Sequence, residues 1–471
     1  MSVYSKLLKN SMIFAIGNLG TKLISFVLVP IYTFALSKGE FGSTDLVTTT
    51  ISLLLPLISL SIYDALLRFS MDKGYSRPEI FSNGIIVVGI GFLFSIALLP
   101  LFNVLEPFKH FIFYFYILLF LQLVNTALQQ FVRGIGKVKL FAFTGIIYSL
   151  MLLISVSVLL ITFKMGMNGY FISLIVSNLL SVIILFIFGD IKKYINFSNI
   201  KLQLTKEMLV YSVPLIPNAM MWWIMNASNR YMIAYFVGVS ANGLFAVATK
   251  IPSMLNIINS IFFQAWQLSA IEEADSKNKS KFYSNVFNMI SSLMFISTSI
   301  LLVCLKFIMK FFVSDQFYDS WKYSPFLFLG VVFSCFSAFL GTNYIAAKDT
   351  KGVFKTSLVG ALINIILNLI LIPLVGVNGA AIATMVSFAV ICYIRLIDTK
   401  KFVHIKIKFR NFSFSLFIIF IQIGLLYLNT SFEFLIQTLL FLVNVIINKE
   451  TILIITGTLQ KKLFKSRVKV I

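Results

Sequence analysis

Apolar runs of about twenty residues recur along nearly the whole chain, separated by short polar segments. A run of that length spans the hydrocarbon core of a bilayer as a helix, and a helix satisfies its own backbone polar groups there. Of the 471 residues, 59% are hydrophobic and 12% are charged, about half the charged fraction of an ordinary soluble protein. The sequence therefore predicts an all-α polytopic membrane protein.

Hydropathy predicts about fourteen transmembrane helices, in groups of six, six and two. The first six are expected near residues 10–36, 44–68, 80–103, 110–132, 139–163 and 168–189, and the second six near 207–237, 241–267, 283–305, 324–347, 353–374 and 377–398. Two weaker segments follow near 411–428 and 432–448. The expected domains are an N-terminal lobe (1–190), a basic cytoplasmic linker (191–206), a C-terminal lobe (207–398), and a second basic linker with two helices and a basic tail (399–471), whose residues 451–463 could form an amphipathic surface helix.

The positive charges are unevenly divided between the two sides of these helices. Of 39 Lys and Arg residues, 30 fall at the termini and in the even-numbered connections, and 6 fall in the odd-numbered connections. The positive-inside rule then places both termini in the cytoplasm, as in a multi-pass protein of a bacterial inner membrane. The net charge of +22 needs no nucleic-acid partner, because anionic lipid head groups attract such segments.

Three cations lie within the expected helices: Lys22, Arg230 and Lys250. A charged side chain near the middle of a bilayer costs roughly 2.5–3.5 kcal/mol, so each should face protein or water. Polar residues fall on the same helical faces as Lys22 and Arg230 at spacings of three and four. The candidate cavity residues are therefore Lys22, Arg230, Lys250, Asn18, Asn226 and Trp223.

Each cation also has a structural interpretation. Lys22 could pair with a carboxylate such as Asp45 or Asp64. Arg230 lies toward the outer end of its helix and could extend to the outer surface. Lys250 could form an ion pair that packs two helices together. These alternatives remain open at the level of sequence.

Other polar or helix-breaking residues admit two interpretations as well. Asp64 precedes Arg68 by four residues, so a local ion pair is the default; coupling to H+ or Na+ through Asp64 or Asp45 is a weaker hypothesis. Pro214 and Pro217 could simply bend the seventh helix, or could form a hinge for a gate. The Trp222-Trp223 pair is more often packing than a platform for a sugar ring.

Two local patterns indicate an internal repeat. Gly-x-Asn-Gly occurs at 166–169 and again at 376–379, an offset of 210, each time at an outer hairpin. An offset of 201 aligns Gly42 with Gly243, again at equivalent outer turns. Two six-helix halves that start on the same side of the membrane are parallel repeats, which can enclose a cavity between them.

No signature of an enzyme or a metal site is present. Gly134-Ile135-Gly136-Lys137 resembles the end of a Walker motif, but Phe131 stands where the first glycine should be. The three cysteines, Cys304, Cys335 and Cys392, lie inside apolar runs at no metal-ligand spacing. We therefore expect neither a catalytic site nor a bound cofactor.

Residues 1 to about 400 resemble the polysaccharide-exporter branch of the multidrug/oligosaccharidyl-lipid/polysaccharide exporter superfamily, in particular the O-antigen and repeat-unit flippases. The resemblance is carried by the following motifs: Gly17-Asn18, Lys22 and Pro30 to Thr33; Phe41 to Leu46; Pro214 to Pro217, Trp222-Trp223 and Asn226 to Arg230; Lys250 to Pro252; Asn364 to Asn368, Pro373 and Gly376 to Ala383. The chain departs from the family at Asn229, where an Asp is common, so Arg230 has no acidic neighbour within its own helix.

The resemblance implies a V-shaped transporter that moves an undecaprenyl-diphosphate-linked oligosaccharide (an O-antigen, capsule or exopolysaccharide repeat unit) to the outer leaflet by alternating access. It also implies a polysaccharide polymerase and other assembly proteins as candidate partners. A lipid II flippase is the nearest alternative. A drug/cation antiporter would need an acid in the first helix, where this chain has Lys22, and a polysaccharide polymerase would need a long external loop.

Overall fold

The computed structural model describes residues 3–72, 74–104, 108–196, 200–272, 279–346, 350–428 and 430–450, with side chains from residue 19 onward except at 261, 264–265, 267–272 and 345–350. Its regular secondary structure is helical, as predicted. Within the described residues, 11 helices are long and apolar enough to cross a membrane, and Leu19–Ala35 and Glu433–Ile447 are shorter apolar helices. The number fourteen therefore remains a prediction.

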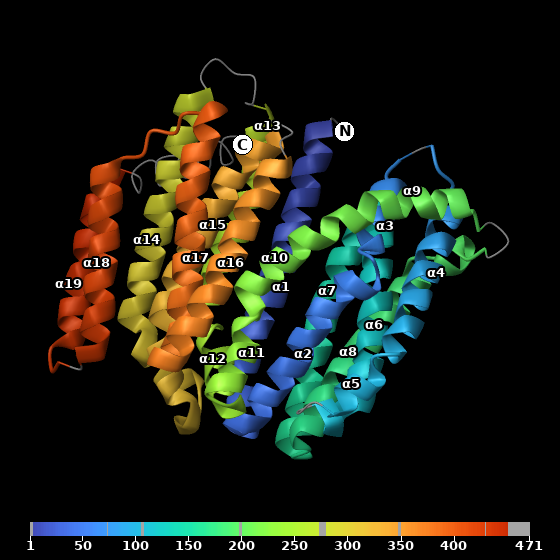
Figure 1. The fold of residues 1–471 in the computed structure, drawn as a ribbon, viewed down its shortest axis with the longest axis horizontal. Coiled ribbons are helices and arrows are strands. Elements are labelled where there is room, and N and C mark those ends of the chain that lie inside the picture. Colours follow the sequence, from blue (N-terminus) through green and yellow to red (C-terminus); the bar gives the residue numbers. More distant parts are fainter. Residues whose placement is uncertain are drawn as a thin grey trace, which may run out of the picture. The chain divides into compact units, whose positions relative to one another are not determined.

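The contacts between residues divide the chain into two compact units. The first comprises Met1–Lys250 with Val313–Phe317, and the second Ile251–Phe312 with Tyr318–Ile471. The first unit contains α1 (Val3–Ala35), α2 (Lys38–Ile58), α3 (Ile62–Ser70), α4 (Arg77–Ile96), α5 (Leu99–Val104), α6 (Phe108–Gly134), α7 (Val138–Val156), α8 (Gly166–Phe188), α9 (Leu202–Ser212), α10 (Ile216–Ala227), α11 (Asn229–Phe236) and α12 (Val239–Ala248) (Figure 1). The second contains α13 (Leu255–Glu272), α14 (Lys279–Phe312), α15 (Ser324–Ala346), α16 (Thr350–Val375), α17 (Val377–Asp398), α18 (Phe409–Leu428) and α19 (Glu433–Ile447).

The helix expected at 44–68 is interrupted, which corrects the sequence-based boundary. The backbone at Leu60 and Ser61 has φ values of 50° and 51°, so two consecutive residues enter the left-handed region that an L-residue helix cannot continue through. Both the amide and the hydroxyl of Ser59 donate to the carbonyl of Leu55. The segment therefore forms two helices, α2 and α3, and continuous hydropathy could not reveal the break between them.

The helix expected at 207–237 is built from several segments. A 3-10 turn over Val213–Leu215 separates α9 from α10, and Pro214 and Pro217 lie at this junction. In Figure 1, α9 runs across the ends of its neighbours and α10 turns down beside α2. The expected bend at the prolines is therefore present, because each proline removes a backbone hydrogen bond.

The two Gly-x-Asn-Gly motifs occupy equivalent places in different hairpins. Gly166 and Gly376 have φ values of 53° and 63° and lie at the starts of α8 and α17. A Cβ on Gly169 would lie 3.0 Å from Leu160 Cδ1, and one on Gly379 would lie 2.4 Å from the Leu371 carbonyl oxygen. The first glycine thus permits the turn, and the second lets the returning helix pack closely on the preceding one.

The helices α2 and α12 cross at a pair of glycines. A Cβ on Gly42 would lie 2.1 Å from the carbonyl oxygen of Val239, and a Cβ on Gly243 would lie 2.1 Å from that of Lys38. The repeat offset of 201 relates Lys38 to Val239 and Gly42 to Gly243. The crossing therefore has local twofold symmetry, and a side chain on either glycine would force the backbones apart.

Arg395 is the most deeply buried cation among the described side chains of the second unit. It is 2% exposed and lies in α17. Its guanidinium donates to Ser337 O at 2.8 Å on α15, and to Thr356 Oγ1 at 2.9 Å and Ser357 Oγ at 3.0 Å on α16. These neutral oxygens join three helices. Arg395 lies within the helix expected at 377–398, although its charge was counted with the cations of the connection that follows.

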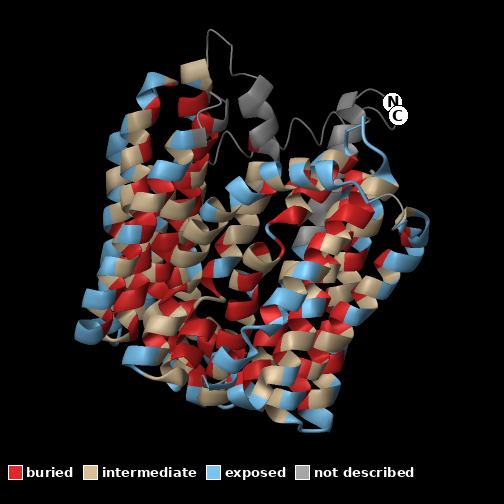
Figure 2. Cartoon of the chain, turned by 45° about the vertical axis from the view of Figure 1, so that its right-hand side comes forward, coloured by how far each residue is buried: buried red, intermediate tan, exposed pale blue. Residues whose placement is uncertain are grey.

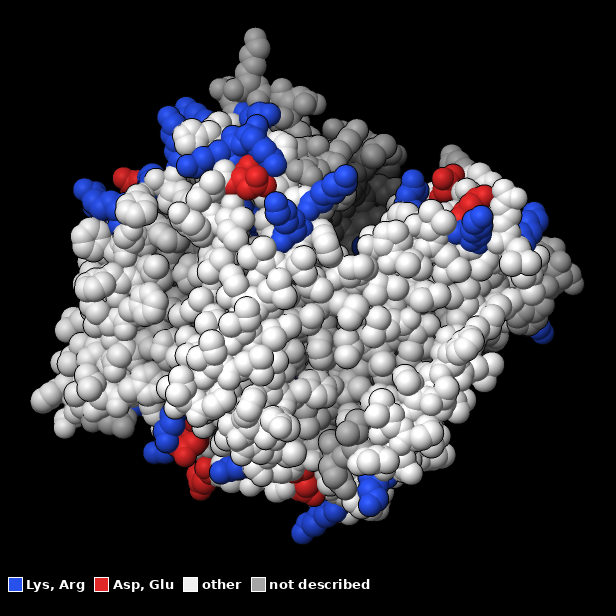
Figure 3. All heavy atoms as spheres, viewed as in Figure 1, with Lys and Arg blue, Asp and Glu red and all other residues white. Residues whose placement is uncertain are grey.

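Burial and charge follow the pattern of a membrane protein. Buried residues line the faces that helices turn toward each other within each unit (Figure 2). Charged side chains gather at the helix ends, and the surface between them is largely uncharged (Figure 3). Lys137 illustrates such an end: its ammonium donates to the carbonyls of Phe188 and Gly189 at the end of α8 and to Asp190 Oδ2 at 2.8 Å. The three cysteines are free thiols, as expected.

Candidate functional site: a charge cluster beside an aromatic cavity

Arg230 at the start of α11 forms an ion pair with Asp45 of α2. Arg230 Nε lies 2.7 Å from Asp45 Oδ2, and the two side chains are only 16% and 12% exposed. The Arg230 Nη1 group also donates to the carbonyl oxygen of Asn226 at 2.9 Å. The guanidinium thus faces the interior of the first unit instead of extending to an outer surface. The acidic partner missing at Asn229 is supplied by another helix.

Further polar groups complete this cluster. The amide of Asn242 on α12 donates to the carbonyl of Gly42 at 3.0 Å and reaches Asp45 Oδ2 at 3.4 Å. The hydroxyls of Tyr231 and Thr50 are hydrogen-bonded to each other. The ammonium of Lys250 interacts electrostatically with both Asp45 and Arg230. The charge cluster therefore holds two cations and one carboxylate.

A cavity of about 340 Å³ is lined by residues of α2, α3, α6 and α10. Its polar lining comes from Trp223, Tyr63, Ser52 and Thr126, and no charged side chain lines it. The Trp223 indole nitrogen donates to Ser52 Oγ at 3.1 Å and to Thr49 O at 3.3 Å. These two bonds tie α10 to α2 and fix the orientation of the ring. The remaining lining residues are Leu53, Leu55, Pro56, Ala219 and Met220.

Cavity and charge cluster share two helical stripes. On α2, Asp45 is followed by Ser52 and then Pro56 toward the cavity. On the α10–α11 side, Trp223 lines the cavity and Arg230, seven residues later, belongs to the cluster. Trp223 also packs against Tyr231, the residue after Arg230, with ring centroids 5.8 Å apart. The structure therefore joins Arg230 and Asp45 in an ion pair and places Trp223 about two helical turns away, at the cavity.

Other predicted residues are placed differently. Asn226 is exposed and contributes its backbone carbonyl to Arg230. Lys22 is partly buried on α1, a helix that packs mainly along α7. Asp64 is partly exposed at the start of α3, and no ion pair joins it to Arg68 among the described side chains. The side chain of Asn18 lies outside the described residues.

Sequence reasoning missed Asn242, Tyr231 and Tyr63. Asn242 lies next to Gly243, whose alignment with Gly42 could have indicated that α2 and α12 meet. Tyr231 adjoins Arg230 and shares its helix. Tyr63 gave no usable signal, because its place in the cavity depends on the break between α2 and α3.

The arrangement can bind an amphiphilic anion. The charge cluster carries an excess of one positive charge when all three groups are ionised, and Arg230 Nη2 makes no hydrogen bond to a described residue. A buried cation strongly attracts a phosphate oxygen, because water screens little there. The neighbouring cavity offers an aromatic ring and hydroxyl groups, which suit an uncharged polyhydroxylated group.

The helical fold and this buried site define a multi-pass membrane protein with a partly cationic interior. The sequence model described as "Polysaccharide biosynthesis protein" matches residues 7–267, more than half of the chain, and a second model, MatE, matches residues 273–370. The chain belongs to the polysaccharide biosynthesis protein family. No curated protein matches it significantly.

Solved structures share the fold at low sequence identity. The lipid II flippase MurJ in an inward closed conformation has a TM-score of 0.68 and 15% identity, covering 96% of this chain and 99% of MurJ. An inward-facing multidrug resistance MATE family transporter of the MOP superfamily has a TM-score of 0.66 and 13% identity, covering 81% and 94%. A MOP superfamily transporter from Pyrococcus furiosus has a TM-score of 0.60 and 12% identity, covering 84% and 94%. These likenesses confirm the predicted fold class.

Proposed function

We propose that this protein moves an undecaprenyl-diphosphate-linked oligosaccharide from the cytoplasmic to the outer leaflet of a bacterial cytoplasmic membrane. The observation that carries the proposal is the partly buried ion pair of Arg230 and Asp45, on which the charge of Lys250 acts, linked through Tyr231 and Trp223 to an uncharged cavity. A lipid-linked oligosaccharide has the same two parts, an anionic diphosphate and an uncharged glycan. Membership of a polysaccharide biosynthesis family supports this substrate class.

In this proposal the two parts of the site act on different parts of the substrate. Arg230 and Lys250 hold the diphosphate, whose desolvation would otherwise be costly in a low-dielectric interior. Trp223 and Tyr63 contact the first sugar. Lys22 is the remaining candidate for a phosphate contact, and it lies on α1. The protein forms no covalent bond to the substrate, so the activity is transport and not catalysis.

Alternating access supplies the movement. The crossing of α2 and α12 is closed by the glycine pair, by the Asn242–Gly42 bond and by the Arg230–Asp45 pair. A substrate phosphate competes with Asp45 for Arg230, so its arrival weakens one of the bonds that join α2 to the α11–α12 segment. Coupling to H+ or Na+ through Asp45 or Asp64 would add a driving force to this exchange.

The test is restoration of surface glycan in a strain that lacks its repeat-unit flippase. K22A, R230A and K250A are compared with the unchanged protein at matched membrane abundance, and K192A provides a cytoplasmic control. We expect R230A and K250A to reduce surface glycan and K192A to leave it unchanged. Unchanged glycan with all three interior variants would refute the proposed roles of these cations.

A lipid II flippase is the second candidate. The reason is that MurJ matches the chain over almost the full length of both proteins. Growth of a conditional strain depleted of its lipid II flippase distinguishes the two. Rescue of growth without restoration of surface glycan would favour lipid II, and the reverse result would favour the oligosaccharide.

A further inference from the structure

The segment 403–408, between α17 and α18, has no regular secondary structure and is held in an extended form by one face of α14. The hydroxyl of Ser280 donates to His404 O, the amide of Lys406 donates to Ser284 Oγ at 2.8 Å, and Asn288 bonds both Lys406 O at 3.0 Å and the amide of Lys408 at 2.9 Å. Ser280, Ser284 and Asn288 are successive residues at a spacing of four, so they form one stripe. Side chains of α14 thus make the hydrogen bonds to the backbone of this segment that a neighbouring strand would make in a sheet.

This anchoring separates the side chains of the segment into two faces. Val403 and Ile405 are 9% and 7% exposed, whereas His404, Lys406 and Lys408 are exposed. Alternate residues of an extended strand are about 7 Å apart and point the same way. The segment therefore presents a row of basic side chains, which we term the basic strand (residues 403–408).

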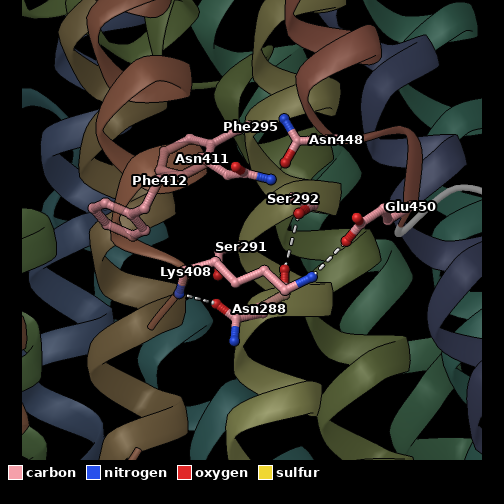
Figure 4. A pocket seen from close by; sticks show the side chains of 9 residues that line it. All are labelled: Asn288, Ser291, Ser292, Phe295, Lys408, Asn411, Phe412, Asn448 and Glu450. Carbon is pink, nitrogen blue, oxygen red and sulfur yellow. Dashed lines mark hydrogen bonds and ion pairs between the residues drawn. The ribbon is translucent and has the colours of Figure 1, made fainter. Parts of the chain in front are cut away.

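A polar pocket supports the far end of the basic strand (Figure 4). The Lys408 side chain crosses this pocket, and its ammonium lies 2.6 Å from Glu450 Oε2. Asn288 lies beneath it, and Asn448 lies farther up in this view, near Phe295. Lys406 makes no ion pair with a described residue, so the row retains an uncompensated cation. In Figure 3, Lys and Arg side chains gather at the same ends of these helices.

The length of α14 indicates the level at which the basic strand lies in the membrane. Its 34 residues measure about 51 Å, against a hydrocarbon core of about 30 Å. Near the other end of α14, Lys306 pairs with Glu433 at 2.7 Å. Counting about 30 Å back from Lys306 at 1.5 Å per residue ends near residue 286. Ser284 and Asn288 are therefore at the boundary between core and head groups, and so is the strand bound to them.

We propose that the basic strand is a binding site for the head group of an anionic phospholipid of the inner leaflet. A phosphate at this level meets Lys406 and His404, whose backbone positions are fixed by α14. A binding site for a soluble polyanion would need cations that project beyond the head groups into water. The hydrogen bonds from α14 instead hold Lys406 and His404 at the membrane boundary, which favours a lipid. The proposal needs the inner-leaflet placement of residues 399–410 but not the identity of the transported substrate.

The test counts lipids bound to the purified full-length protein by native mass spectrometry, with phosphatidylglycerol or phosphatidylcholine added to the detergent. We expect the unchanged protein to prefer phosphatidylglycerol. K406Q/K408Q should lose that preference by about fivefold, since a cation at the membrane surface contributes about 1 kcal/mol and the charge of Lys408 is already compensated by Glu450. K192Q/K193Q, which removes two exposed cations of the first unit, is the matched control and should retain it.

A second variant tests the geometry apart from the charge. N288A keeps every cation and removes two bonds to the strand, so it should also weaken the preference for phosphatidylglycerol. Equal lipid binding by K406Q/K408Q and the unchanged protein would overturn the proposal, as would an equal loss in K192Q/K193Q. Displacement of the lipid by millimolar inorganic phosphate would identify a site for free phosphate instead.

Discussion

Arg230 and Asp45 lie 185 residues apart in the chain, yet their side chains meet at 2.7 Å inside the first unit. The pair joins α11, which carries the candidate phosphate ligand Arg230, to α2, which crosses α12. Its two members therefore influence both substrate binding and the stability of the closed crossing. Separating these effects requires variants of each residue and of both together.

We expect D45N and R230Q each to lower the stability of the purified protein by about 3 kcal/mol, because removing one partner leaves the other charge poorly solvated. The double variant D45N/R230Q should lose less than the sum of the single losses. Thermal unfolding in detergent of the four proteins forms a double-mutant cycle. Strictly additive losses would show that the pair does not couple the two helices.

The glycine crossing predicts a symmetric response to substitution. G42A and G243A each place a methyl carbon 2.1 Å from a backbone carbonyl oxygen, far inside van der Waals contact, so we expect each to destabilise the protein by about 1–3 kcal/mol. G89A on α4 is the matched control, since a Cβ there meets nothing within 4 Å, and alanine favours a helix. A G42A protein as stable as G89A would contradict the observed crossing.

The two adjacent tryptophans predict different effects on transport. Trp223 lines the cavity and Trp222 does not. We expect W223L to reduce surface glycan several-fold at unchanged membrane abundance, and W222L to have a smaller effect. W223F should restore part of the activity, because a smaller aromatic ring can still contact a sugar. Equal loss in W222L and W223L would point to packing as the role of both residues.

We expect substitution of Arg395 to lower the stability of the protein through lost hydrogen bonds between helices. R395Q and R395K should each lower stability by about 3 kcal/mol, because each leaves buried oxygens of α15 and α16 without a donor. Lysine keeps the charge but lacks the planar fork that reaches several acceptors. K400Q, a change at an exposed residue just beyond α17, is the control for thermal unfolding. Wild-type stability of R395K would show that charge alone is what the site requires.

The end of α8 predicts a dependence of stability on pH. The hydrogen bond from Lys137, its charge and that of Lys193 lower the pKa of Asp190 in the folded protein. A lowered pKa contributes stability above the unfolded value, and that contribution disappears as the pH falls through the folded value. We expect the unchanged protein to lose stability on acidification through this range more steeply than D190N. Parallel profiles would exclude a contribution from this pair.

Local sequence was sufficient for features that depend on neighbouring residues. The Gly-x-Asn-Gly repeats predicted two equivalent hairpins, and the prolines near residue 215 predicted a bend, because each effect operates within one turn of the chain. The break at Leu60 and Ser61 was missed because its residues are as apolar as those of an unbroken helix.

Features that join distant helices were beyond the reach of a single sequence. Helical periodicity placed Trp223 and Arg230 on one face, but it could not show that this face meets Asp45. The charge of Arg395 was counted with the following connection because cations normally gather at the ends of apolar runs. Its four neutral acceptors come from two other helices and leave no pattern near it in the sequence.

The crossing of α2 and α12 also bears on the origin of the chain. A contact in which each partner offers the same surface to the other is the interface of a C2 homodimer. A half-length ancestor could have paired with itself in this way before duplication and fusion. The polar residues have since diverged: the repeat offset relates Asp45 to Ala246 and Phe41 to Asn242. In a dimer of identical chains both matching positions would carry the same residue. After fusion, Asp45 can carry a carboxylate while its counterpart Ala246 does not.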